Sequence, residues 1–112
     1  MSSIRPYPLG FSHSSAKAGL HNAVRSLSLE LTPQNIFFSE INPGMVDTGG
    51  YDSEEVKDSI RIISKSFGYE YDELPLMPPE SVAEAVMLCL ESKAHILNID
   101  LVSQGQIPHL GA

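Results

Sequence analysis

Two segments with the composition of β-strands, residues 35–41 and 95–102, are far apart in the sequence and separated by two predicted helices. Aromatic and branched residues dominate the first segment, and leucine and isoleucine alternate through the second. Because a helical connection joins strands that run in the same direction, the two strands are expected to be parallel, with a right-handed crossover. Two parallel strands make a poor sheet alone. The pattern therefore predicts an α/β chain whose apolar sheet edge needs further cover.

A long helix is predicted before the first strand, over residues 13–31. Apolar residues recur there at three- and four-residue steps, and Ser12 or Ser14 could cap its start. The Thr32-Pro33 pair is expected to end it. Small residues along this helix permit close approach by another element.

The segment between the strands predicts two further helices, over residues 53–66 and 80–92. Ser53 is placed to cap the earlier one, and Glu54 and Glu55 suit its first turn, where acidic residues oppose the helix dipole. For the later helix we expect four residues to face inward, namely Val82, Val86, Cys89 and Leu90.

Composition limits the classes of protein to which the chain can belong. Its 112 residues are enough for one small domain, and 42% hydrophobic with 19% charged residues is typical of a globular chain. A net charge of −7 argues against nucleic acid as a partner, because that binding depends on lysine and arginine. No apolar run approaches the ~20 residues of a membrane span. The single Cys89 cannot form an internal disulfide, which favours a cytoplasmic location.

His13 and Lys17 are the first candidates for residues that transfer protons or bind a charged ligand. They are four residues apart, so on a helix they lie on one face, one turn from each other. Residues 1–25 contain three arginines and lysines and no acid, whereas all fourteen acids follow. This bias could favour an anionic cofactor near Lys17, or it could be a chance clustering of three charges.

Four segments together carry a resemblance to a known family. Ser-Ser-Ala-Lys-Ala-Gly-Leu at residues 14–20 resembles the active-site helix of the short-chain dehydrogenases/reductases, whose motif is Tyr-x-x-x-Lys. Asn-Pro-Gly-Met-Val-Asp-Thr at residues 42–48 resembles the family's Pro-Gly-x-Val-x-Thr segment. Residues 79–86 resemble its late Pro-Glu-Asp-Val-Ala-Glu-Ala-Val helix. Residues 94–100 look most like the branch of 3-hydroxy acid and serine dehydrogenases.

The resemblance implies a fold and a reaction. The fold would be the C-terminal part of a Rossmann-like, doubly wound parallel sheet, with residues 1–112 forming one partial domain. No Gly-rich turn for the pyrophosphate occurs in the sequence, so the dinucleotide-binding half of the family fold is expected to be missing. The implied reaction is NAD- or NADP-dependent hydride transfer between a small-molecule alcohol and a carbonyl. As a truncated chain, it is expected to bind little or no cofactor alone, and it could be inactive.

The catalytic residues implied by the resemblance are Ser3, His13 and Lys17. Lys17 matches the family lysine, which binds the nicotinamide ribose. His13 stands where the family has tyrosine, and its imidazole would replace the phenol as proton donor. Ser3 resembles the catalytic serine at the end of a strand, although its distance from His13 is three residues shorter than the family spacing.

The cofactor-binding residues implied in the same way are Lys17 and the segment after the first strand, with Pro43, Gly44, Val46 and Thr48. In the family, the backbone near Val46 holds the nicotinamide carboxamide. The helix at 53–66 corresponds to the variable substrate lid. In the loop after it, Tyr69 and Tyr71 could line a substrate pocket or simply pack.

The sequence also permits other interpretations. The chain could be a non-catalytic remnant of the family that acts through protein–protein association. The helix at 13–31 could also support a homo-oligomer. Ser14-Ser15-Ala16-Lys17 matches the S-x-x-K motif of penicillin-binding enzymes, but S-D-N and K-T-G are absent. A metal site on His13 and His21 would need further ligands, and no metal is expected.

Overall fold

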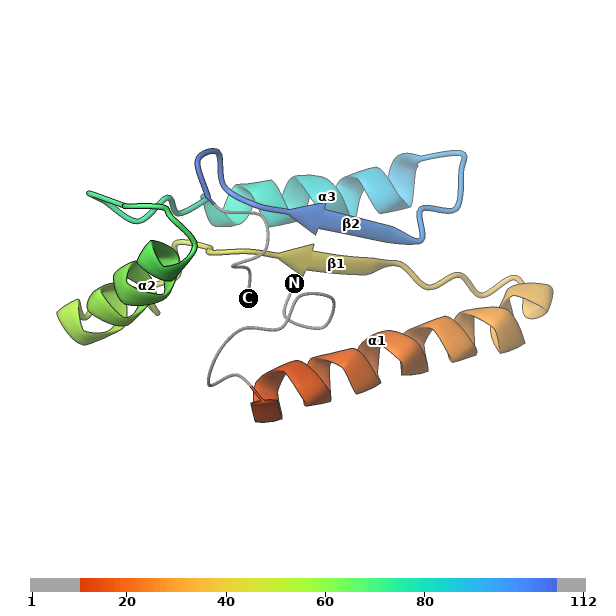
Figure 1. Ribbon diagram of the computed structural model, residues 1–112. Helices are drawn as coiled ribbons and strands as arrows, with labels where there is room; N and C mark the ends of the chain where they lie inside the picture. Colours follow the sequence, from red (N-terminus) through yellow and green to blue (C-terminus); the bar gives the residue numbers. More distant parts are fainter. Residues whose placement is uncertain (1–10, 107–112) are drawn as a thin grey trace.

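The computed structural model describes residues 11–106 and contains four helical segments and two strands (Figure 1). Helices and parallel strands confirm an α/β arrangement consistent with part of a Rossmann-like fold. In chain order, the elements are α1 (Phe11–Leu31), the 3₁₀ helix η1 (Thr32–Gln34), β1 (Glu40–Pro43), α2 (Glu54–Ser66), α3 (Pro79–Glu91) and β2 (Asn98–Leu101).

The two strands pair in parallel, as expected, but both are shorter than predicted. β1 pairs with β2 from Glu40↔Asn98 to Pro43↔Leu101, so the strand predicted at 35–41 begins five residues late. Asn35 closes η1 in a left-handed conformation (φ 64°), which delays the extended chain. Side chains hold the two segments together before the ladder begins. The Ser39 hydroxyl donates to the Ile96 carbonyl (2.7 Å).

The two faces of the sheet differ in chemistry. Ile41 and Ile99 lie on one face, and Ile41 lines a pocket with Val86 and Cys89 of α3, so α3 packs on that side of β1. The other face is polar: the amide of Asn42 donates to Asn98 Oδ1 (2.8 Å) and to Asp100 Oδ1 (3.1 Å). Parallel sheets usually carry apolar residues on both faces, so this polar face is a departure from the common pattern.

α1 lies on the polar side of the sheet, and its position corrects two expectations. It begins at Phe11, so Ser12 and Ser14 lie inside the helix and do not cap it. No residue of α1 is buried, and Leu20 is 58% exposed. Half-buried Val24 lines a pocket with Phe38 and Leu97, but other apolar residues of α1, such as Leu20, stay exposed. The reason is that much of the sheet face toward α1 offers hydrogen-bonding groups in place of an apolar surface.

α3 also leaves predicted core residues exposed. Val86 and Leu90 were expected to face inward, yet they are 42% and 73% exposed. The buried residue of α3 is Ala85. Among residues 11–106, the most buried side chain is Ser64 of α2, and Met45 and Met77 are each 4% exposed beyond the carboxyl ends of the strands. Two of the three buried apolar residues in this range thus lie in the region where a ligand would bind in an open α/β sheet.

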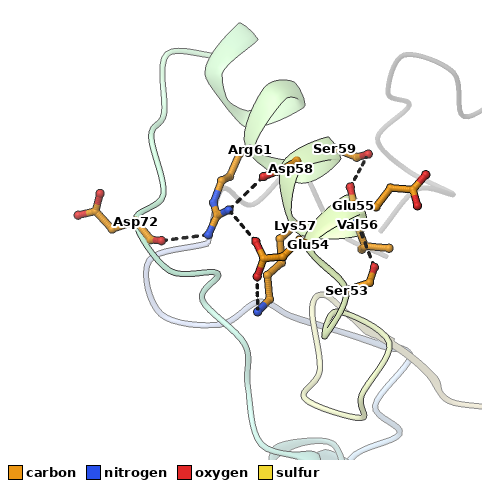
Figure 2. A network of polar contacts seen from close by, with 9 residues as sticks. All are labelled: Ser53, Glu54, Glu55, Val56, Lys57, Asp58, Ser59, Arg61 and Asp72. Carbon is orange, nitrogen blue, oxygen red and sulfur yellow. Dashed lines mark hydrogen bonds and ion pairs between the residues drawn. The ribbon is translucent and has the colours of Figure 1, made fainter.

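α2 is the element that the sequence predicts best. The Ser53 hydroxyl accepts from Val56 N–H (3.2 Å), as a capping serine should, and Glu54 and Glu55 follow in the first turn (Figure 2). Figure 2 also shows Arg61 reaching from α2 to the loop that follows, where its guanidinium donates to the Asp72 carbonyl (3.2 Å). α2 and this loop are therefore tied into one unit. None of the helices within residues 11–106 is long and apolar enough to cross a membrane.

Replacing the capping serine should destabilise α2. We expect Ser53→Ala to lower the free energy of unfolding by about 1 kcal/mol, because Val56 N–H loses its acceptor. Urea unfolding followed by circular dichroism measures this. Ser59→Ala is the matched control: Ser59 is exposed and its hydroxyl only donates to the Glu55 carbonyl within the helix, so its loss should cost less than about 0.5 kcal/mol.

Candidate functional site

The loop that leaves β1, residues 44–48, contains three of the predicted cofactor-binding residues and is here named the β1 exit loop. Its first residue continues the ladder, since Gly44 N–H donates to the Leu101 carbonyl (2.7 Å). Met77, from the segment before α3, then bonds the loop twice: Met77 N–H donates to Met45 O (2.9 Å), and Asp47 N–H donates to Met77 O (2.8 Å). These bonds make the isolated parallel bridge between Val46 and Met77.

Val46 is left with a free backbone donor. In a parallel bridge, the residues on either side of Val46 make the two hydrogen bonds to Met77, so the N–H and C=O of Val46 point away from Met77. The Val46 carbonyl accepts from Thr48 N–H (2.9 Å). The Val46 N–H makes no hydrogen bond with any residue in the range 11–106. Val46 is half-buried and Thr48 is exposed.

A third segment, the turn at residues 103–106, also holds the loop, and no sequence pattern predicted this contact. Gln106, the last of the described residues, is 5% exposed. Its side-chain oxygen Oε1 accepts from Met45 N–H (3.2 Å) and from Ser103 N–H (3.3 Å). The preceding Gly105 adopts a positive φ of 88°, which is the one local sign of an ordered turn at this point.

The predicted catalytic residues lie on a different element. Lys17 and His13 are exposed in the first turns of α1. α1 runs opposite to the strands, so its first turns lie toward the end of the sheet where β1 and β2 finish (Figure 1). Ser3 lies outside the described residues. His13 and Lys17 are therefore on a helix whose first turns lie toward the same end of the sheet as the β1 exit loop. The other predicted cofactor-binding residues lie in that loop or directly before it, namely Pro43, Gly44, Val46 and Thr48.

α1 is joined to β1 by a polar contact between His21 and Glu40. The imidazole Nδ1 meets the Glu40 carboxylate, and the two side chains are only 13% and 15% exposed. His21, considered above as a metal ligand, is thus engaged by a carboxylate. No group of three or more histidine, cysteine, aspartate or glutamate side chains within residues 11–106 could hold a metal ion. The contact fixes the helix that carries His13 and Lys17 relative to the sheet.

Loss of this contact should loosen α1. We expect His21→Ala to lower the free energy of unfolding by about 1–3 kcal/mol, because the mostly buried Glu40 carboxylate loses a hydrogen-bond donor. Amide hydrogen exchange should accelerate along α1 more than along α3. Asn22→Ala, at the exposed neighbouring position, serves as the control and should leave both helices unchanged. Equal exchange in the two variants would contradict a holding role for His21.

The segment between α2 and α3 contributes both packed and exposed side chains. Met77 is buried and holds the β1 exit loop through its backbone. Tyr71 is half-buried, whereas Tyr69 is 48% exposed. Tyr69 is therefore available to a ligand, and the loop that carries it is anchored to α2 by Arg61.

Comparison with known proteins gives a partial match. The chain is 33% identical over 89 residues to a 3-oxoacyl-[acyl-carrier-protein] reductase (FabG) of Aquifex aeolicus (strain VF5). This likeness supports a relationship to the short-chain dehydrogenases/reductases. The match covers 75% of this chain but only 32% of the reductase, so the chain spans about a third of that relative's length. It does not distinguish one branch of dehydrogenases from another. No family model matches the chain, and no solved structure does.

Proposed function

We propose that this chain carries the nicotinamide side of an NAD(P) site in an oxidoreductase that interconverts an alcohol and a carbonyl. The observation that carries the proposal is the free Val46 N–H, which a clamped loop presents at the carboxyl end of β1. Ligands of open α/β sheets bind at this end of the strands. The partial likeness to a reductase supports the same reaction class.

The residues present fit the nicotinamide half of such a cofactor. A carboxamide has an oxygen that accepts hydrogen bonds, and the Val46 N–H is a donor without a partner in residues 11–106. The exposed Thr48 hydroxyl, two residues further on, can bond the same group or a phosphate. Lys17 can donate its ammonium hydrogens to the hydroxyls of the ribose. When bound, the nicotinamide would supply or accept the hydride.

His13 is assigned the proton transfer to or from the substrate oxygen. Imidazole exchanges protons near neutral pH, which suits a general acid or base. It is shorter than the tyrosine of related enzymes, so it would meet the substrate oxygen in a different position. Ser3, outside the described residues, remains the proposed partner that holds this oxygen.

The rest of the cofactor site is expected to come from a Gly-rich strand–turn–helix unit, which binds the pyrophosphate through backbone N–H groups. The sequence contains no Gly-rich motif for such a turn, so we propose that the choice between NAD and NADP is made by that unit. For the substrate we propose a small hydroxy acid and its carbonyl form. The ending at residues 94–100, which resembles 3-hydroxy acid and serine dehydrogenases, supports this choice. The unpaired Cys89 supports a cytoplasmic setting.

Lys17→Ala tests the assigned ribose contact. We expect it to weaken binding of reduced nicotinamide mononucleotide at least about tenfold, because a charged donor to a hydroxyl contributes about 1.5–3 kcal/mol. It should also abolish any NAD(P)H-dependent carbonyl reduction, while His13→Tyr should increase it. Lys93→Ala, an exposed lysine beyond α3, is the control. Unchanged binding and activity in both Lys17→Ala and His13→Tyr would exclude the assigned active site.

A second candidate function is association with another protein, and the open edge of β1 favours it. Glu40 and Gly44 bond to β2, so the backbone groups of Ser39 and Ile41 point to the opposite edge, where no described residue pairs with them. Unpaired strand edges are templates for another chain. The exposed apolar residues of α1, including Leu20 and Leu27, support a homo-oligomer. Sedimentation at several concentrations tests this: a monomer at all of them would exclude self-association.

A further inference from the structure

Gln106 links two segments that are 61 residues apart in the sequence. Its oxygen Oε1 accepts one hydrogen bond from the β1 exit loop, at Met45 N–H, and one from the turn after β2, at Ser103 N–H. A carbonyl oxygen has two lone pairs, so these two donors use the whole acceptor capacity of Oε1. Because Gln106 is buried, water cannot replace it at either donor.

The glycine in the Pro-Gly pair makes room for this contact. A Cβ on Gly44 would lie 2.5 Å from Oε1 and 2.8 Å from Nε2 of Gln106, well inside van der Waals contact. The amide of Gln106 therefore lies against the bare backbone of Gly44, and only there can it reach Met45 N–H. The Gln106 amide occupies the space that a side chain at position 44 would need, so the two positions constrain each other.

The β1 exit loop is thus held from two directions. Gln106 holds the N–H of Met45, and Met77 bonds the carbonyl of Met45 and the N–H of Asp47. Val46 lies between these fixed groups, so the direction of its N–H is set by them. We propose that Gln106 is a positioning residue that fixes the β1 exit loop so that Val46 N–H can bind a nicotinamide carboxamide. This inference rests on the proposed function.

The experiment compares Gln106→Met with Gln104→Met in the purified chain. Methionine keeps the length of the side chain but removes the acceptor. Gln104 lies in the same turn and is exposed, so it is the matched control. Amide exchange at Met45, Val46 and Ser103 is measured by NMR, and reduced nicotinamide mononucleotide and AMP serve as ligands. Gln106→Glu, which retains an acceptor oxygen, is the rescue variant. Gln106→Asn, which is too short to reach Met45, is used if the methionine variant does not fold.

We expect Gln106→Met to accelerate exchange at Met45 and Ser103 about tenfold and to weaken mononucleotide binding by a similar factor. Gln104→Met should change neither, Gln106→Glu should restore much of the binding, and AMP should show no dependence on residue 106. Unchanged amide exchange at Met45 would show that Gln106 does not hold the β1 exit loop, and would overturn the proposal. Faster exchange with unchanged mononucleotide binding would overturn the positioning role. No mononucleotide binding by the unmodified chain would instead overturn the proposed function and, with it, this role.

Discussion

Gly44→Ala is expected to lower the free energy of unfolding by about 2–4 kcal/mol and to abolish nicotinamide binding. The new Cβ would lie 2.5 Å from Gln106 Oε1, so the Gln106 amide must move. Moving it takes the acceptor from two backbone N–H groups, at Met45 and Ser103, and each unsatisfied buried donor costs about 1–3 kcal/mol. Urea unfolding gives the stability, and NMR titration gives the binding.

Two comparisons make this result specific. Gly50→Ala changes a glycine of the same region whose added Cβ would meet nothing within 4 Å, so stability should hardly change. In a Gln106→Ala background, Gly44→Ala should cost much less, because the clashing amide has been removed; such non-additivity identifies residues in direct contact. Equal costs in the two backgrounds would mean that the Gly44–Gln106 contact does not limit the packing here.

Met77→Ala is expected to cost about 2–5 kcal/mol, the usual range for removing a buried methionine side chain. Met77 is 4% exposed, in a chain that buries few side chains completely, so the cavity has little surrounding structure to fill it. The loss should also loosen the β1 exit loop, because Met77 bonds Met45 and Asp47 through its backbone. Thermal unfolding measures the first effect, and exchange at Asp47 N–H measures the second.

Met87→Ala is the matched control for this change. Met87 is 48% exposed on α3, so its replacement by alanine should alter stability by less than about 0.5 kcal/mol. If Met77→Ala and Met87→Ala proved equally mild, the packing beyond the carboxyl ends of the strands would not be the stable centre of this chain.

Local sequence signals predicted those parts of the fold that depend on local chemistry. Ser53 and the two glutamates after it mark the start of α2, because capping and helix-dipole interactions need only neighbouring residues. The parallel direction of the strands followed from the helices between them. The predicted start of β1 was wrong. Asn35 adopts a left-handed conformation, and residues 36–39 have no partner in the β1–β2 ladder, so they stay out of the strand.

Features that depend on tertiary contacts could not be predicted. The prediction that Leu90 faces inward on α3 was wrong, because periodicity does not tell which side of a helix will find a packing partner. No local sequence pattern singled out Gln106, and only the fold brings it to Met45. Conversely, Pro43, Gly44, Val46 and Thr48 were predicted as a group from the resemblance of residues 42–48 to a family segment. They lie together because they are near neighbours in sequence, and their cofactor role stays a prediction. The assignment of His13, Lys17 and Ser3 to the reaction stays a prediction.

The most direct test of a nicotinamide site at the β1 exit loop is an NMR titration of the unmodified chain with reduced nicotinamide mononucleotide. We predict that the largest amide shift changes occur at Val46 and Thr48, that they saturate, and that Lys17→Ala weakens them. A folded chain whose Val46 amide does not respond, or whose largest changes lie away from residues 44–48, would contradict the proposed site.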